Sequence, residues 1–102
     1  MKEDENKNMK EFLTDKEFKK LSYIEKLKYL ANGKITTEES AHLEDGDFVD
    51  HINLRINGLC FAVDGIHYFA SKHEAIKAGK KLKQKFSKKL SLKLRRIENE
   101  IR

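Results

Sequence analysis

The stretch that decides the fold runs from residue 51 to residue 69 and reads His51-Ile-Asn-Leu-Arg-Ile-Asn57-Gly58-Leu-Cys-Phe-Ala-Val-Asp64-Gly65-Ile-His-Tyr-Phe69. Asn57-Gly58 and Asp64-Gly65 each stand between segments in which apolar residues alternate. Both dipeptides favour two-residue hairpin turns, because the two turn positions need a positive φ angle. Two such turns predict a three-stranded antiparallel meander, with strands at about 51–56, 59–63 and 66–69.

Two-residue turns also fix which residues face each other across the strands. Side chains alternate between the faces of a strand, and both hairpins place their apolar residues on the same face. That face collects Ile52, Leu54, Ile56, Leu59, Phe61, Val63, Ile66 and Tyr68. The other face collects Asn53, Arg55, Cys60, Ala62, His67 and Phe69. One side of the predicted sheet therefore needs a cover.

A long helix that can supply this cover is predicted directly after the sheet. Ser71 and Glu74 have the spacing of a capping box, and between about 72 and 101 only Gly79 weakens the helical pattern. Such a helix would reach ~45 Å, whereas a six-residue strand covers only ~20 Å. We therefore expect the helix to pack on the sheet as far as about Phe86, and residues 88–102 to need another partner.

Ahead of the sheet the sequence predicts a pair of helices. Thr14 and Glu17 form a capping box for a helix from about 15 to 31, and Thr36 and Glu39 form another for a short helix through residue 43. The pair can also be read as a helix-turn-helix, although its second helix is acidic. Residues 1–12 are charged and predict a flexible tail. The predicted class is α+β in the order α-α-β-β-β-α, with residues 13–102 as one domain.

The composition favours a cytoplasmic protein. No apolar run has the length needed to span a bilayer, and the N-terminus lacks the apolar core of a secretory signal. Cys60 is the single cysteine among 102 residues, so an internal disulfide is excluded and a reducing compartment fits. We expect no membrane association.

The net charge of +5 is divided unevenly along the chain. From residue 68 onward twelve Lys and Arg stand against three Glu, a net of +9, whereas residues 1–67 carry a net of −4. The predicted helix has few Glu at the i+4 spacing that would relieve its lysines, and like charges this dense favour an anionic partner. We expect that partner to be RNA, DNA or a host ribonucleoprotein, bound through Lys77, Lys80, Lys81, Lys85, Lys88, Lys89, Arg95 and Arg96.

The polar face of the predicted sheet offers a second contact surface. Arg55, His67 and Phe69 supply a guanidinium, a hydrogen-bonding ring and a ring for stacking, which are the groups that single-stranded nucleic acid needs. The alternative is that the N-terminal helices cover this face.

Nothing in the sequence predicts catalysis, a metal or a cofactor. The four histidines are not paired by spacing with a nucleophile, a carboxylate or one another. The acidic loop Asp45-Gly-Asp-Phe-Val-Asp50 does not match the spacing of a calcium loop. We therefore expect a non-enzymatic protein.

Three resemblances bear on function. The helix pair and meander resemble the middle of the small ribonuclease toxins of the RelE kind, but the first strand of those toxins and the arginine of their central strand are missing here. Residues 59–80 are similar in topology to the DNA-binding N-terminal modules of some phage integrases, which implies a sheet face that reads DNA. In size, charge and lack of catalytic motif the chain resembles phage and mobile-element accessory proteins of the anti-CRISPR kind, which implies an inhibitor that occupies a host nucleic-acid machine.

Self-association is a structural alternative to nucleic-acid binding. An apolar stripe continues into the part of the helix that extends beyond the sheet. A homodimer would use it as a seam through Leu90, Leu94, Ile97 and Ile101.

Overall fold

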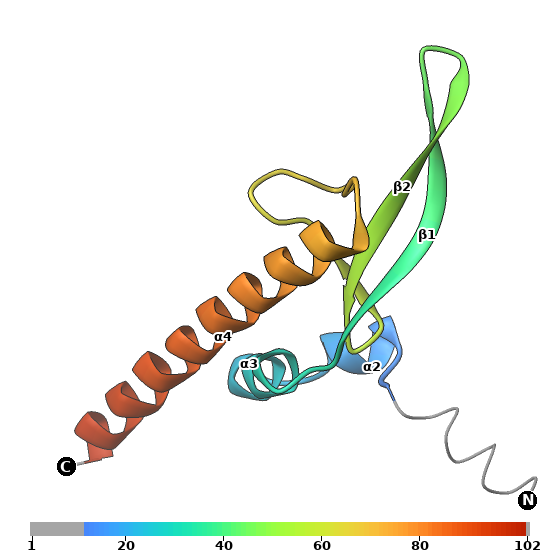
Figure 1. Cartoon of the computed structure of the whole chain (residues 1–102). Coiled ribbons are helices and arrows are strands. Elements are labelled where there is room, and N and C mark those ends of the chain that lie inside the picture. The colour runs from blue at the N-terminus through green and yellow to red at the C-terminus, as the bar shows by residue number, and fades with distance from the viewer. Residues whose placement is uncertain (1–11, 102) are drawn as a thin grey trace, which may run out of the picture.

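The protein has an α+β fold in which a three-stranded antiparallel sheet is joined to one long C-terminal helix (Figure 1). A computed structural model describes residues 12–101. Its elements are, in order, α2 (Asp15–Lys19), α3 (Tyr23–Ala31), β1 (Ile35–Glu44), β2 (Asp47–Ile56), β3 (Leu59–Phe61) and α4 (Lys72–Ile101). The predicted order and the long C-terminal helix are confirmed. The tail predicted over residues 1–12 lies outside the described residues, apart from the half-buried Phe12.

The single helix predicted over 15–31 is divided into α2 and α3. Thr14 caps α2 together with Glu17, as predicted. Ser22 and Glu25 form a second capping box, in which each side chain accepts a hydrogen bond from the other residue's backbone N–H. The cap holds Ser22 in an extended conformation, with ψ at 166°. An extended residue cannot continue a helix, so the chain starts a new one.

The short helix predicted over residues 36–43 is wrong, because this segment is strand β1. It pairs with β2 along its whole length, from Ile35 opposite Ile56 to Glu44 opposite Asp47. Asp45-Gly46 forms the connecting turn with φ angles of 53° and 88°, close to the 50° and 81° of Asn57-Gly58. The ten-residue ladder outweighs the local capping preference of Thr36 and Glu39. The helix pair is therefore α2 and α3, and β2 begins at Asp47 rather than near residue 51.

The strand predicted at 66–69 is also wrong, and the strand predicted at 59–63 ends at Phe61. The register around Asn57-Gly58 is as predicted, with Ile56 opposite Leu59. The Asp64-Gly65 turn forms too, and Val63 bridges Ile66. Beyond it, however, Phe69 pairs with Ile52 of β2 through backbone hydrogen bonds of 2.8 and 2.9 Å. The edge of β2 past the end of β3 is free to take this partner, so the returning segment does not run beside β3.

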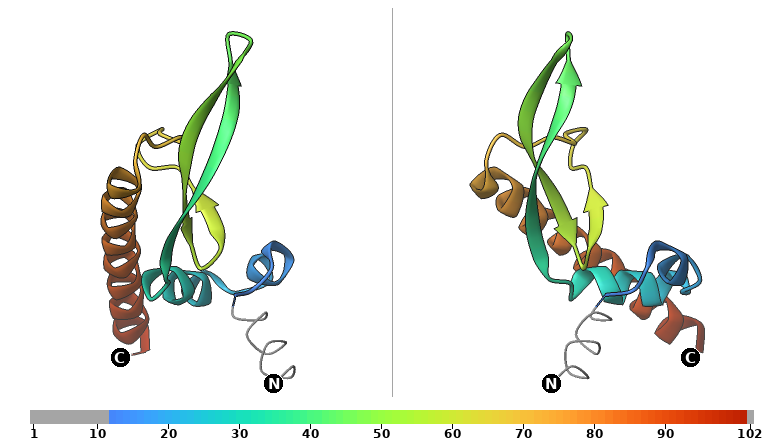
Figure 2. Two further views of the ribbon diagram at one scale, coloured as in Figure 1. Left: turned by 45° about the vertical axis from the view of Figure 1, so that its right-hand side comes forward. Right: turned by 90° about the vertical axis from the view of Figure 1, so that its right-hand side faces the viewer.

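The core lies between the sheet and the first half of α4 (Figure 2). Gly79 is required there, since a Cβ atom would stand 2.8 Å from Leu54 Cδ1 and 3.1 Å from Ile35 Cγ2. We call this side of the sheet the α4 face. Of the eight apolar residues predicted on it, Leu54, Ile56 and Val63 are buried and Ile52, Leu59 and Phe61 are half-buried. Ile66 and Tyr68 are exposed, because the segment that carries them is not a strand.

The second half of α4 extends past the sheet and packs against α3 (Figure 1). Lys93 Nζ lies 6.0 Å from the centroid of the Tyr23 ring at one end of this contact. Asn57 connects α3 to the sheet, because its side chain donates to the Tyr29 carbonyl and accepts from the Lys34 amide, each at 2.8 Å. Helix α3, the second part of the predicted N-terminal helix, is therefore a partner for this half of α4, one of the possibilities that the helix length predicts.

Candidate nucleic-acid interface

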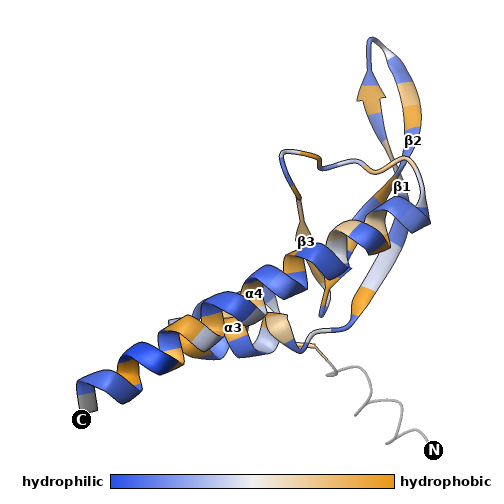
Figure 3. Ribbon diagram, turned by 60° about the vertical axis from the view of Figure 1, so that its left-hand side comes forward, coloured by the Kyte–Doolittle hydropathy of each residue, from blue (hydrophilic) through white to orange (hydrophobic). Residues whose placement is uncertain are grey.

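A row of exposed basic side chains lines the side of α4 that points away from the sheet. Ala75 and Gly79 are buried and mark the side toward the sheet. With 3.6 residues per turn, the opposite side carries Lys77, Lys81, Lys88 and Arg95, which we call the outer row. All four are exposed. The row spans ~27 Å at 1.5 Å per residue, and hydrophilic residues dominate α4 along its length (Figure 3).

The other predicted residues of this helix flank the outer row. Lys85, Lys89 and Arg96 follow on one side of it and Lys80 on the other, and each is exposed. All eight predicted helix residues are therefore exposed, with Lys89 the furthest from the outer row. The helix is unbroken at Gly79, so the four residues of the outer row stay on one side along its length.

Most of this positive charge has no carboxylate beside it. Lys81 Nζ lies 3.4 Å from Asp64 Oδ2, and Lys72 Nζ lies 3.9 Å from Glu39 Oε2. Within residues 12–101 no other Lys or Arg of α4 forms an ion pair. Exposed pairs of this kind contribute little, about 0–1 kcal/mol. The field of α4 is therefore only slightly neutralised by the rest of the described chain.

Arg55 lies on the opposite face of the sheet from α4. It is the cross-strand partner of Thr36, one residue out of phase with Leu54 on the α4 face. Its Nε and Nη2 atoms donate to Glu38 Oε1 at 3.1 and 2.9 Å, and Nη1 donates to the Gly58 carbonyl at 2.8 Å. The hydrogen bonds from Arg55, followed by the one from Asn53, hold the pKa of Glu38 below its usual value. Arg55 is thus engaged within the molecule and separated from the outer row by the sheet.

The expected position of Phe69 on the polar face is wrong. Phe69 pairs with Ile52 and so shares the α4 face with it, where only 4% of Phe69 is exposed. Its ring belongs to the core cluster with Leu54, Val63 and Ala75 and cannot stack on a base without leaving that core. His67 is exposed, with its ring centroid 6.4 Å from that of Tyr68.

Two histidines that are not paired by sequence spacing, His42 and His51, meet on the polar face. His42 Nδ1 lies 2.9 Å from His51 Nδ1, and the Tyr68 ring stacks on His42 with centroids 4.1 Å apart and planes at 12°. Tyr68 also lies 4.2 Å from the His51 ring. We call this side of the sheet the histidine face. The Asp45-Gly46 dipeptide is the signal that could have found this pair, because a hairpin turn there brings residues 42 and 51 onto neighbouring strands.

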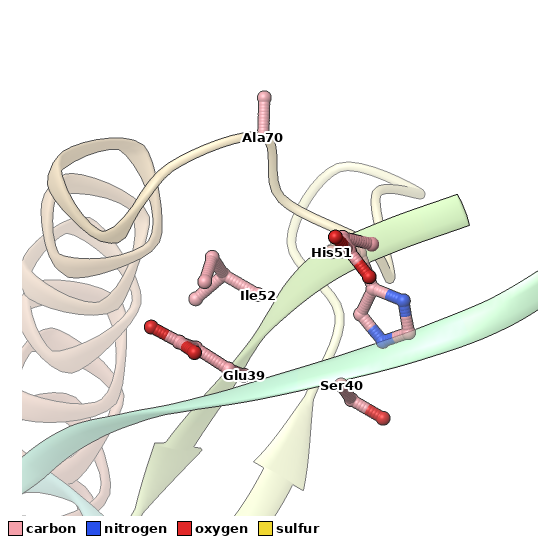
Figure 4. Close-up of a pocket in the computed structure, with 6 residues that line it drawn as sticks. Glu39, Ser40, His51, Ile52 and Ala70 are labelled. Atoms are coloured by element: carbon pink, nitrogen blue, oxygen red, sulfur yellow. The ribbon is translucent and has the colours of Figure 1, made fainter. Parts of the chain in front are cut away.

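The histidine pair has the character of a structural network. All four ring nitrogens have partners, since His42 Nε2 lies 3.1 Å from Glu44 Oε1 and His51 Nε2 lies 2.9 Å from Asn53 Oδ1. Each ring is therefore held in place by hydrogen bonds at both of its nitrogens. Among residues 12–101, no group of three or more His, Cys, Asp or Glu is arranged to hold a metal ion. A polar hollow of about 360 Å³ lies beside His51, with Glu39, Ser40, Ile52 and Ala70 around it (Figure 4).

The predicted dimer seam is partly occupied. Leu90 and Ile97 are half-buried, and they lie one turn before and after Lys93, which contacts α3. Leu94 follows Leu90 by four residues and precedes Ile97 by three, so it shares their side of the helix, but it is 40% exposed. Ile101 belongs to α4, but its side chain lies outside the part of the chain that the structure describes. The stripe is therefore half-buried at Leu90 and Ile97 and exposed at Leu94.

Within the described part of the chain, no helix has both the length and the apolar character needed to cross a bilayer. Comparison with known protein families, with curated proteins and with solved structures finds no match.

Proposed function

We propose that this protein binds RNA or DNA, free or within a host ribonucleoprotein, through the exposed basic surface of α4. The observation that carries the proposal is the outer row. Its side chains are exposed along one continuous helix, and only Lys81 has an ion-pair partner within residues 12–101. Dense like charge of this kind raises the local concentration of a polyanion and is relieved when one binds.

The mode of binding that we propose is contact with phosphate groups. Lys and Arg that neutralise phosphates release condensed counterions, which supplies affinity without reading the base sequence. Arg55 has its donors engaged by Glu38 and Gly58, and Phe69 is buried. We therefore assign no base-reading role to the sheet and expect weak sequence preference.

The role that we propose is a non-enzymatic one in the cytoplasm. A small protein that covers phosphates can block a nucleic-acid machine by occupying it, as phage and mobile-element inhibitors of the anti-CRISPR kind do. The size of the chain, its charge asymmetry and the surface of α4 support this role. A pull-down from the native host, with and without nuclease, would separate a nucleic-acid target from a protein target.

The direct test reverses charge on the outer row. The variant Lys77→Glu, Lys88→Glu, Arg95→Glu is compared with the matched control Lys16→Glu, Lys19→Glu, Lys20→Glu, which changes the net charge equally at exposed positions on and next to α2. We expect the α4 variant to lose tenfold or more in affinity for RNA or duplex DNA, since three phosphate contacts become repulsive. The control should change affinity far less.

Circular dichroism of both variants checks that each remains folded. Equal losses of affinity in the two variants would show that net charge alone governs the binding of RNA or DNA. That result would contradict a specific role for α4.

A further inference from the structure

The β1–β2 hairpin ends in a projecting apolar pair. Leu43 and Phe48 face each other across the strands on the α4 face, beyond the part of the sheet that α4 covers (Figure 1). They are 63% and 78% exposed. The acidic residues Glu44, Asp45 and Asp47 adjoin this pair at the turn, with Glu44 and Asp47 directed to the histidine face, and residues 38–50 contain no Lys or Arg. We call Leu43, Phe48 and these three acidic residues the hairpin tip.

The hairpin behind the tip is held in place. On the histidine face, Tyr68 stacks on His42 and lies at a tilt against His51, and His51 is only 7% exposed. Further along, Arg55 donates twice to Glu38 across the strands. A projecting element that is already ordered loses little conformational entropy when it binds. The exposed Phe48 is therefore presented on a fixed arm.

A groove of complementary chemistry lies between α3 and α4. Tyr23 and Leu92 form its apolar part and are 55% and 54% exposed. Lys89, Lys93 and Arg96 form its basic rim, and the hollow measures about 240 Å³. An apolar pair at an acidic hairpin end thus has its counterpart in an apolar centre within a basic rim. We call this site the α3–α4 groove.

The tip and the groove lie at opposite ends of an elongated molecule, whose principal extents are 59 × 41 × 23 Å (Figures 1 and 2). A tip cannot reach the groove of its own chain, but it can reach that of a second copy. Two copies placed antiparallel would form two identical tip-to-groove contacts related by a two-fold axis, the commonest symmetry of homo-oligomers. We infer that the hairpin tip of one copy docks into the α3–α4 groove of a second copy.

This self-association goes beyond the proposed nucleic-acid binding and does not depend on it. The contact differs from the seam predicted through Leu90, Leu94, Ile97 and Ile101, because it uses the opposite ends of the molecule. Lys89 and Arg96 belong both to the groove and to the flank of the outer row. A polyanion on α4 therefore competes with the tip for the same positive charge.

The test is sedimentation velocity without nucleic acid, at low salt and over a wide range of concentration. The tip variant Asp45→Lys, Asp47→Lys and the groove variant Lys89→Glu, Arg96→Glu each place like charges on both sides of the contact. We expect each variant alone to associate at least tenfold more weakly than the wild type. In an equal mixture both tip-to-groove contacts join opposite charges again, and a heterodimer should form.

Two further variants keep the test specific. Phe48→Ala should also weaken association tenfold or more, as aromatic anchors at interface centres do. Leu94→Glu should leave association unchanged. A wild type that is monomeric at every concentration overturns the inference, as does a mixture of the two charge variants that fails to associate. If Leu94→Glu were the only variant to lose association, the contact would lie at the predicted seam instead, and the inference would also be overturned.

Discussion

The histidine face of the sheet and the outer row of α4 use charged residues in opposite ways. On the histidine face Arg55, Glu38 and Asn53 are joined by hydrogen bonds within the molecule, and both histidines have a partner at each ring nitrogen. On α4 the positive side chains of Lys77, Lys88 and Arg95 are exposed and form no ion pair within residues 12–101. The difference separates charge that is bonded within the fold from charge that we propose binds a partner.

The largest effect on the free energy of unfolding is expected in the core, where the sheet packs against α4. Leu54 is fully buried between the sheet and α4. Its Cδ1 atom lies close to Gly79, 2.8 Å from where a Cβ atom would stand. Leu54→Ala should lower the free energy of unfolding by about 2–5 kcal/mol, because it removes buried methyl groups and leaves a cavity. Denaturant unfolding measures the change. Leu92→Ala, at a site that is 54% exposed, should stay within about 0.5 kcal/mol of the wild type.

A smaller effect is expected from removal of the ring that covers the histidine pair. Tyr68→Ala should lower the free energy of unfolding by about 0.5–1.5 kcal/mol through the lost stacking. It should also speed amide hydrogen exchange in β1 and β2 near residues 42 and 51. Phe48→Ala, at an exposed ring that contacts no other ring within residues 12–101, is the comparison, measured at concentrations where the protein is monomeric. Equal exchange rates in both variants would show that the stack does not order the hairpin.

Arg55 and Arg95 form a matched pair that sharpens the comparison. Arg55→Ala should lower the free energy of unfolding slightly, since it breaks an exposed ion pair with Glu38, and should leave RNA binding within a factor of two. Arg95→Ala should leave stability unchanged and weaken RNA binding several-fold. Denaturant unfolding measures the stability of each variant, and a binding titration measures its affinity for RNA. If Arg55→Ala weakened binding more than Arg95→Ala did, the two regions would have exchanged roles.

The smallest effect is a pH dependence that belongs to the histidine face. Hydrogen bonds from Arg55 and Asn53 lower the pKa of Glu38 in the folded state. A depressed pKa means that this contribution to stability is complete above the ordinary carboxyl pKa and is lost as the pH falls through the lower folded value. Glu38→Gln should therefore flatten the acid limb of a plot of stability against pH. An unchanged acid limb would mean that Glu38 is not held by Arg55 in solution.

The sequence predicts those features of the sheet and of α4 that depend only on residues close together in the chain. The turn at Asn57-Gly58 and the register beside it follow from two residues that tolerate positive φ, at 50° and 81°. The exposed face of α4 follows from helical periodicity alone, because Ser71 caps the helix and no proline interrupts it. The surface of α4 was therefore predictable without knowing what packs against the helix.

The features that failed are those in which long-range pairing decides. Thr36 and Glu39 have the spacing of a helix cap, but the segment finds ten partners on β2. Phe69 follows a turn that does form, yet it pairs with Ile52 instead of continuing beside β3. The meeting of His42 and His51 depends on the first of these pairings. The turn signal at Asp45-Gly46 therefore reveals it only when residues 36–43 are taken as a strand.

The central claim is that the charge of α4 is left for phosphates, and the salt dependence of binding tests it most directly. Affinity for duplex DNA is measured across a range of salt concentrations for the wild type and for the variant Lys77→Glu, Lys88→Glu, Arg95→Glu. If about five phosphates are neutralised, the logarithm of affinity should fall against the logarithm of salt with a slope of about −4 to −5 for the wild type. The slope should be clearly shallower for the variant. A wild-type slope near zero, or the same slope in both proteins, would contradict the account.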